Sequence, residues 1–191
     1  MEQSSLFNTR QMLDEQLRES CAKVNYSYVC HNYMTNRFIS RDTRLKIALI
    51  LLSAFTLASL LISVYFNEKL TTIIGLISSL LVLIVTVYQK DFNLETRVNE
   101  HRKTADALWK IKEDFISLLI DFDDLELSDI RKNRDELLQR LDEIYRQAPR
   151  TDKRAYREAQ KAIKIEEEQT FSKNEEVDSI LPITLRRNSN E

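Results

Sequence analysis

The side chains that could do chemistry in this sequence form a few small groups. Two histidines, His31 and His101, and two cysteines, Cys21 and Cys30, stand isolated along the chain. Nine residues apart on a helix, the cysteines point to opposite sides, and neither has metal-ligand spacing to a second pair. We interpret both as unreactive thiols in a reducing compartment. His101 fits better as a polar residue that sets helix register than as a metal ligand or catalyst.

Charged residues gather in two places near the carboxyl end. An acidic run with the carboxylates that calcium prefers consists of Asp121, Asp123, Asp124, Glu126 and Asp129. It lacks the loop glycine and terminal glutamate of an EF-hand, which favours a solvated connection between helices. A basic stripe that could contact an anion or nucleotide consists of Lys153, Arg157, Lys161 and Lys164. Glutamates are interspersed, which favours a solvated mixed-charge face.

Small polar residues lie inside two apolar runs. They are Thr56, Ser59 and Ser63 in the first run, and Thr72, Gly75, Ser79 and Thr86 in the second. At 100° per residue, each set shares one side of a helix. Gly75 and Ser79 form a small-x-x-x-small pair that lets helices approach closely in lipid. Two interpretations stay open: helix packing, or the lining of a water-filled pathway that several assembled copies would enclose.

Catalytic constellations are not evident. We find no nucleophile beside a base, no paired carboxylates in an evident cleft and no phosphate-binding loop. The sequence therefore predicts no enzyme, no catalytic residue, no cofactor and no metal site. The net charge of −2 gives no general attraction for nucleic acid, so direct nucleic-acid binding is not expected.

The elements that carry these residues are helices. The chain has 191 residues, with one glycine and two prolines, too few for a glycine-rich α/β or β fold. Residues 47–66 carry no charge and would span about 30 Å, the thickness of a bilayer core. Residues 71–88 form a second such run after a four-residue connection. The sequence thus predicts a transmembrane hairpin, 47–89, with spans 47–66 and 71–88.

Basic residues predict the orientation of the hairpin. They precede the first span and follow the second, as Arg37, Arg41, Arg44 and Lys46, then Lys90, Arg97, Arg102 and Lys103. The connection offers only Lys69. The positive-inside rule then places both termini in the cytoplasm of a multi-pass inner-membrane protein.

Amphipathic helices flank the hairpin. Residues 1–46 predict one long helix, or two, from the apolar positions Leu6, Leu13, Leu17, Val24 and Tyr28. A heptad seam, of the coiled-coil type, follows the second span through Leu94, Val98, His101, Ala105, Leu108, Lys112, Phe115, Leu119 and Phe122. We expect Ser128 and Thr151 to cap two further helices, and Ser172 with Glu175 to cap a fourth.

The predicted fold class is an all-α membrane protein, in which a two-helix hairpin joins cytoplasmic helices that form a small bundle. Residues 90–185 supply the second cytoplasmic segment, and 186–191 a tail. On the helix after Thr151 the predicted inner face is Tyr156, Ala159 and Ile163.

The organisation resembles the SLATT family, the SMODS- and SLOG-associating two-transmembrane effector domains of bacterial conflict systems. The resemblance covers residues 15–185, and its more specific part follows the second span. It rests there on Tyr145, Ala148, Pro149, Thr151, Ala155, Tyr156, Ala159, Thr170-Phe171-Ser172 and Leu181-Pro182.

The resemblance implies a function that the residues alone do not name. Family membership would make the chain a pore-forming or membrane-disrupting effector in antiviral defence, acting in abortive infection. It would work as a homo-oligomer in the lipid bilayer. Its trigger would come from the cytoplasm, through a nucleotide signal or a sensor such as a nucleotidyltransferase or reverse transcriptase. The alternative is a non-conducting membrane-anchored scaffold that recruits a cytoplasmic partner. A transporter subunit is disfavoured because the spans carry no charge.

Overall fold

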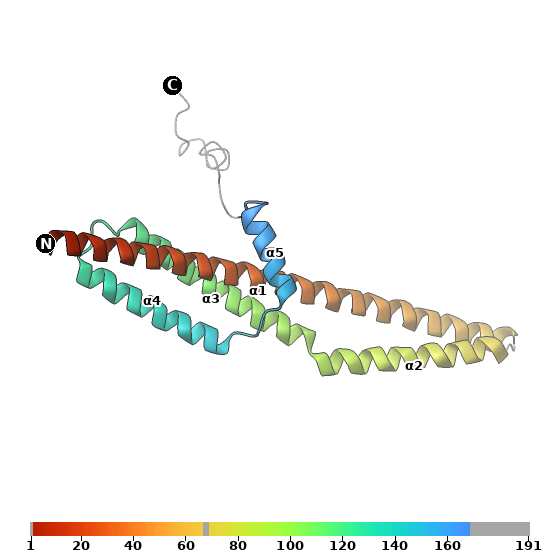
Figure 1. Cartoon of the computed structure of the whole chain (residues 1–191). Coiled ribbons are helices and arrows are strands. Elements are labelled where there is room, and N and C mark those ends of the chain that lie inside the picture. The colour runs from red at the N-terminus through yellow and green to blue at the C-terminus, as the bar shows by residue number, and fades with distance from the viewer. Residues whose placement is uncertain (1, 67–68, 169–191) are drawn as a thin grey trace, which may run out of the picture.

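The computed structural model describes residues 2–66 and 69–168, and all regular elements in these ranges are helices. Their order and bounds are α1 (Glu2–Phe66), α2 (Lys69–Phe92), α3 (Leu94–Ile120), α4 (Leu127–Gln147) and α5 (Lys153–Lys164). They form an elongated molecule with the α1–α2 hairpin at one end (Figure 1). The predicted all-helical fold is confirmed for this part of the chain. The predicted helix at Ser172 and the tail at 186–191 lie outside the described residues.

Helix α1 is one uninterrupted rod of 65 residues. At 1.5 Å per residue it is about 97 Å long. The sequence predicted either one helix or two before the hairpin. A single helix forms because the first 66 residues of the chain contain no glycine or proline. The same helix therefore supplies the predicted first span and the segment on which α3, α4 and α5 pack.

Helices α2 and α3 are separated by one residue, Asn93. Its backbone is left-handed, with φ 37° and ψ 56°. Asparagine is one of the few residues other than glycine that visits this conformation readily. The Asn93 N–H still donates to the Gln89 carbonyl oxygen at 3.2 Å. The chain thus bends between the hairpin and α3 without losing that backbone hydrogen bond.

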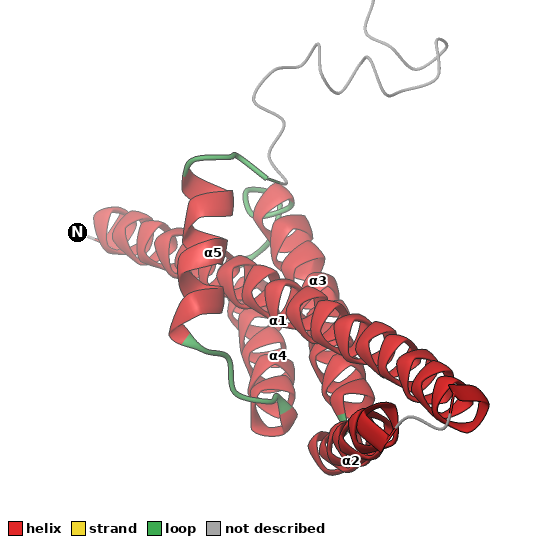
Figure 2. Ribbon diagram, turned by 90° about the vertical axis from the view of Figure 1, so that its right-hand side faces the viewer, coloured by secondary structure: helices red, strands yellow, loops and turns green. Residues whose placement is uncertain are grey.

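The apolar core lies between the first part of α1, α3 and α4, which run side by side (Figure 2). Its buried members are Leu13, Leu17, Val24, Leu108, Ile111, Phe115, Leu118, Phe122, Ile130, Leu137 and Leu141. Three of the five apolar positions predicted before the hairpin, Leu13, Leu17 and Val24, are in this core. Tyr28 packs at its border, and the Leu6 side chain is outside the described ones.

The predicted seam on α3 is right in its first half and shifted in its second. Ile111 and Leu118 are buried where Lys112 and Leu119 were expected. The Lys112 ammonium lies over the Trp109 ring, 4.8 Å from its centroid. The shift occurs because α4 also packs on this half of α3, so the buried face turns toward two partners.

Two predicted helix starts are wrong by one or two residues. The N-cap of α4 is Glu126, so Ser128 lies inside the helix. The N-cap of α5 is Asp152, whose Oδ1 accepts the Ala155 N–H at 2.7 Å, so Thr151 precedes the cap. Carboxylate acceptors suit this position because they bond the free amides of the first turn.

The inner face of α5 also differs from its prediction. Ala155, Ala159 and Ala162 are buried against α1, whereas Tyr156 is exposed and Ile163 is half-buried. Three alanines leave no long side chain between the helices, so α5 crosses α1 at close range.

The acidic run lies in the α3–α4 connection and is held by α1. One Arg10 nitrogen, Nη2, donates to the carbonyl oxygens of Phe122, Asp123 and Leu125 at 2.6, 3.1 and 3.0 Å. These contacts use backbone oxygens, which explains how a strongly acidic segment can be fixed in place by one cation.

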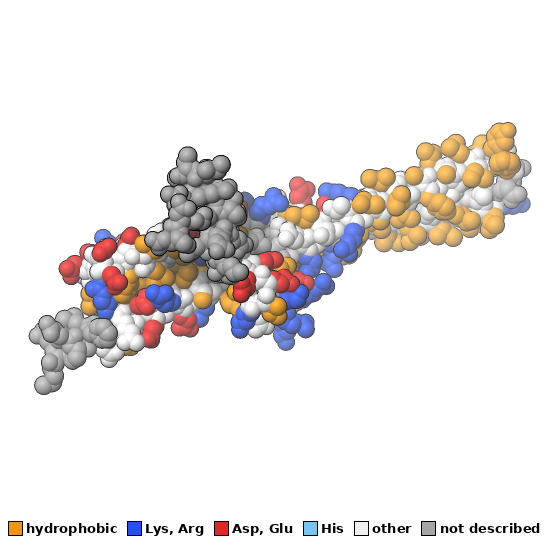
Figure 3. Space-filling view, turned by 90° about the horizontal axis from the view of Figure 1, so that it is seen from above, with side chains coloured by type: hydrophobic (Ala, Val, Ile, Leu, Met, Phe, Trp, Pro, Cys, Tyr) orange, Lys and Arg blue, Asp and Glu red, His pale blue; other side chains and the backbone are white. Residues whose placement is uncertain are grey.

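Two helices are long and apolar enough to cross a membrane. Only 6% of the most apolar window of the first, and 11% of that of the second, is buried. The core helix of a water-soluble protein would bury most of such a window. The hairpin instead exposes apolar side chains over the surface that Figure 3 shows.

Candidate functional site: the hairpin and its junction with the other helices

Within the hairpin, the less exposed residues recur at spacings of four and three. On α1 they include Leu45, Leu49, Leu52, Thr56, Ser59 and Ser63, and on α2 Gly75, Ser78, Val82, Val85 and Gln89. This repeat of 3.5 residues keeps two helices that wind around each other in contact over several turns. The contact between α1 and α2 therefore runs along the hairpin.

Hydroxyl groups join the two helices inside this contact. Thr56 Oγ1 donates to Ser78 Oγ at 3.0 Å, and the hydroxyls of Ser63 and Thr72 form a second pair nearer the connection. Buried Ser59 donates to the Phe55 carbonyl oxygen at 2.8 Å. Hydrogen bonds of this kind satisfy polar groups that would otherwise face hydrocarbon.

Gly75 is buried against α1. A Cβ atom built on Gly75 would stand 3.1 Å from Leu60 Cδ2 and 3.6 Å from the Ser59 Cβ. The glycine is thus part of the helix contact, as the small-residue pattern predicted.

Ser79 and Thr86 are placed differently from the other predicted stripe residues. Both are exposed, and Thr86 Oγ1 donates to the Val82 carbonyl oxygen of its own helix. Ser78, which the sequence analysis missed, occupies the contact that Ser79 was expected to make. The contact face of α2 runs through Gly75, Ser78, Val82, Val85 and Gln89. Ser79 and Thr86 each come one residue after a member of that face, about 100° further around the helix. The predicted set therefore divides into five contact residues and two outward-facing ones.

The two histidines, predicted to be isolated, lie against each other. Nδ1 of His31 on α1 is 2.9 Å from Nδ1 of His101 on α3, and both side chains are buried, at 3% and 2% exposed. The isolation inferred from the sequence is wrong because α1 and α3 bring positions 70 residues apart to the same level. The Phe38 ring lies next to His101, with 5.5 Å between the ring centroids and an angle of 31° between the ring planes.

The histidine contact requires that the accepting ring be neutral. One Nδ1 must carry a proton to donate, and the other must be unprotonated to accept. Burial, together with the charge of His101, lowers the pKa of His31 from 6.5 to about 4. Burial also lowers the pKa of His101. Two ligands alone make no structural metal site, and the described residues contain no group of three or more metal-ligating side chains.

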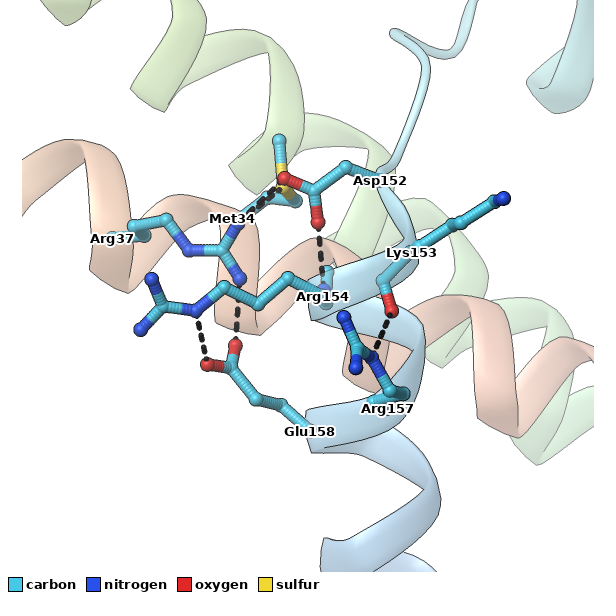
Figure 4. A network of polar contacts seen from close by, with 8 residues as sticks. Met34, Arg37, Asp152, Lys153, Arg154, Arg157 and Glu158 are labelled. Carbon is cyan, nitrogen blue, oxygen red and sulfur yellow. Dashed lines mark hydrogen bonds and ion pairs between the residues drawn. The ribbon is translucent and has the colours of Figure 1, made fainter.

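Arg37 ties α5 to α1 (Figure 4). Its two guanidinium nitrogens contact Asp152 at 2.6 Å and Glu158 at 2.7 Å. Glu158 also accepts from Arg154 at 3.0 Å. The Arg37 guanidinium contributes to the lowered pKa of Asp152, after the hydrogen bond from the Ala155 amide. Sequence patterning could assign Arg37 a side of the membrane but not these partners.

The predicted basic stripe is on α5, and two of its four side chains, Arg157 and Lys161, have separate contacts. Lys161 pairs with Glu166 at 2.5 Å, and Arg157 Nε donates to the Lys153 carbonyl oxygen at 3.4 Å. Lys164 lies in the last turn. These contacts give the mixed-charge helix face that the sequence favoured over an anion site.

Helix α5 has a groove on each side where it meets α1. One groove, of about 720 Å³, lies along α1 toward α4, and its lining includes Lys23, Tyr26, Tyr145, Arg150 and Tyr156. The Tyr26 and Tyr156 rings stack there at 6.1 Å. The other, of about 630 Å³, reaches the first apolar run, and four of its ten lining residues are arginines.

The family of the chain follows from comparison with known proteins. The model of the SMODS and SLOG-associating 2TM effector domain family 4 matches residues 13–175. The chain therefore belongs to this family of two-transmembrane effector domains, which confirms the resemblance seen in the sequence. No curated protein and no solved structure matches the chain. Two apolar helices and this family together indicate a membrane protein.

Proposed function

We propose that this protein is an inner-membrane effector of a bacterial antiviral system that works by abortive infection. On a cytoplasmic trigger, copies of the hairpin assemble and permeabilise the membrane. Both termini and helices α3 to α5 face the cytoplasm, as the basic residues at the hairpin ends favour. The membership in a 2TM effector family supports the effector role.

The observation that carries the assembly step is the outward position of Ser79 and Thr86 on α2. One hairpin cannot enclose a pore, so a conducting form needs several copies. The hydroxyls of Thr56, Ser63 and Thr72 are engaged within one hairpin. Ser79 and Thr86 are exposed on the apolar surface and share one side of α2. They are the groups through which α2 can approach another copy or face water inside an assembly.

The proposed trigger binds in the groove between α1 and the α4–α5 connection. A volume of about 720 Å³ suits a small ligand or the inserted side chains of a partner. Stacked tyrosines offer aromatic faces, and Lys23 and Arg150 offer positive charge. Because α1 continues unbroken into the hairpin, a ligand that moves α5 across α1 acts on the helix that also spans the membrane.

A non-conducting scaffold is the second candidate. It is favoured by the hydroxyl pairs inside the hairpin, which leave most of its polar groups engaged in a single copy. In that role the hairpin would only anchor α3, α4 and α5, and a cytoplasmic partner would bind the same groove.

Membrane potential separates the two candidates. Cells that express the chain with its neighbouring genes are infected, and a voltage-sensitive dye is followed. We expect depolarisation in the wild type and its loss in Ser79→Leu. Ser53→Leu, the same change at an exposed serine of α1, is the matched control and should depolarise normally. Unchanged polarisation in the infected wild type, or normal depolarisation by Ser79→Leu, would contradict the pore and favour the scaffold.

A further inference from the structure

A second groove lies where α5 meets α1 beside the first span. This groove, of about 630 Å³, is lined by four arginines, Arg37, Arg41, Arg44 and Arg154, and by one glutamate, Glu158. Its lining continues to Leu45 and Ala48, at the start of the apolar run. Figure 3 shows basic side chains gathered at this boundary, where the apolar hairpin begins.

The spacing of the arginines on α1 builds one wall of the groove. Arg37, Arg41 and Arg44 follow one another at four and three residues, so they share a side of the helix. Ala48 lies four residues after Arg44. The positive stripe therefore leads directly into the part of α1 that lies in the hydrocarbon.

The ion pairs of the groove leave two of its cations available. Arg37 is engaged by Asp152 and Glu158, and Arg154 shares Glu158. Among the described residues Arg41 and Arg44 have no such partner, and both are exposed. Arg37 holds α5 in place as the opposite wall, while Arg41 and Arg44 face the opening.

We propose that this groove binds the headgroup of an anionic phospholipid from the cytoplasmic leaflet. Guanidinium groups pair with phosphate oxygens through two parallel hydrogen bonds, which favours arginine over lysine for such recognition. The groove lies at the level of the headgroups if residues 47–66 occupy the hydrocarbon core. Exposed Ile47 and Ile50 follow it on α1 and would meet the acyl chains.

Basic residues at a membrane boundary also orient a transmembrane hairpin, whatever groove they line. The proposal concerns only lipid binding in this groove. A diffuse attraction depends on the number of charges near the surface. Lipid affinity at a defined groove depends instead on which charges are removed, because only the charges that line it contact the headgroup. The inference rests on the membrane placement of the hairpin and not on pore formation.

The test compares two double variants of the full chain, purified in a neutral detergent. Arg41→Gln with Arg44→Gln removes two charges from the groove. Arg102→Gln with Lys103→Gln removes two exposed charges of α3 that lie outside the groove lining. Retained lipids are counted by native mass spectrometry during titration with phosphatidylglycerol, with phosphatidylcholine, and with inorganic phosphate as the headgroup-free probe.

We expect the wild type and the α3 variant to retain one phosphatidylglycerol each, well above phosphatidylcholine. The groove variant should bind it about 30-fold more weakly, about 2 kcal/mol for two cations. Equal weakening in both double variants would overturn the groove in favour of diffuse charge. Equal retention of both lipids, or competition by inorganic phosphate at the same concentration as the lipid, would overturn recognition of an anionic lipid. Because no trigger or conductance is involved, these outcomes are independent of the membrane-potential test.

Discussion

The hairpin and the remaining helices are built on opposite distributions of polarity. Between α1, α3 and α4, apolar side chains such as Phe115 fill the interior and charges cover the surface. Between α1 and α2, hydroxyls and a glycine lie in the contact while leucines and isoleucines cover the surface. The difference is typical of one continuous helix, α1, whose first part packs in water and whose second part suits lipid. Its association with partners depends on apolar burial in the first region, and on close approach and hydrogen bonds in the second.

The largest expected effect is in the apolar core. Phe115 is fully buried among α1, α3 and α4, so Phe115→Ala removes a large side chain and leaves a cavity. We expect a loss of about 3–5 kcal/mol in the free energy of unfolding of this region. The fluorescence of Trp109, the sole tryptophan, reports the transition in denaturant. Ile116→Ala, at a more exposed position of the same helix, should lose far less, and an equal loss would contradict the assigned core.

A lysine introduced at an exposed position tests whether that surface faces lipid, as expected for the hairpin, or water, as expected for α3. Leu57 in the hairpin is 61% exposed and Ile120 at the end of α3 is 75% exposed. Leu57→Lys should cost about 3 kcal/mol in membrane insertion, since lysine is unfavourable near a bilayer centre. Ile120→Lys should be nearly neutral because water solvates its ammonium group. Extraction of membranes with alkaline carbonate measures insertion. Retention of both variants in the membrane would contradict the boundary between the regions.

Acidification should lower the free energy of unfolding of the part where α1, α3 and α4 pack together, and leave the contact between α1 and α2 unchanged. His31 has a folded pKa of about 4 against an ordinary 6.5, so the unfolded chain binds a proton first as the pH falls. Its stabilising contribution is complete above pH 6.5 and is lost between 6.5 and 4. From pH 7 to 5.5 we expect a loss of about 1 kcal/mol in the free energy of unfolding.

The matched variant is His31→Gln, whose amide can still bond His101 but does not titrate. The same Trp109 unfolding measurement should show a smaller loss between the two pH values than in the wild type. Charged groups near the pair, including Arg97, Glu100 and Asp152, act on His101 in both proteins. Equal pH dependence of the variant and the wild type would remove His31 as the cause.

The smallest expected effect concerns α5. Arg37→Gln breaks two ion pairs that hold it, at a cost of about 1 kcal/mol or less because the pairs are partly exposed. Backbone amides of residues 153–164 should then exchange with deuterium up to about fivefold faster. Arg18→Gln, which breaks an exposed pair within α1, is the control and should leave α5 unchanged. Identical exchange in both variants would show that the three alanines alone hold α5.

Much of the fold could be predicted from local pattern. The uncharged lengths of 47–66 and 71–88 determine the two spans, since a bilayer has a fixed thickness. The spacing of Leu13, Leu17 and Val24, and of Leu94, Val98 and Leu108, determines which helix sides are buried. Family membership was also readable in the sequence, and the comparison confirms it.

The histidine pair left a signal that the sequence analysis did not use. Leu17, Val24 and His31 follow one another at intervals of seven, as do His101, Leu108 and Phe115. When each of two helices carries a polar residue at a core position, the two residues are candidates for contacting each other. Which level of α1 meets which level of α3 depends on the bend at Asn93, and no pattern within either helix contains that information.

By itself, then, the sequence determined the helical class, the two apolar runs of the hairpin, the buried sides of α1 and of the first half of α3, and the family, because these follow from composition and short-range periodicity. Only the tertiary structure decided that His31 meets His101, that Ser78 rather than Ser79 faces α1, and that Arg37 holds α5 beside an arginine-lined groove. These contacts join residues 22 to 121 positions apart. Their register depends on how whole helices pack, and a shift of one residue turns a side chain about 100° around its helix.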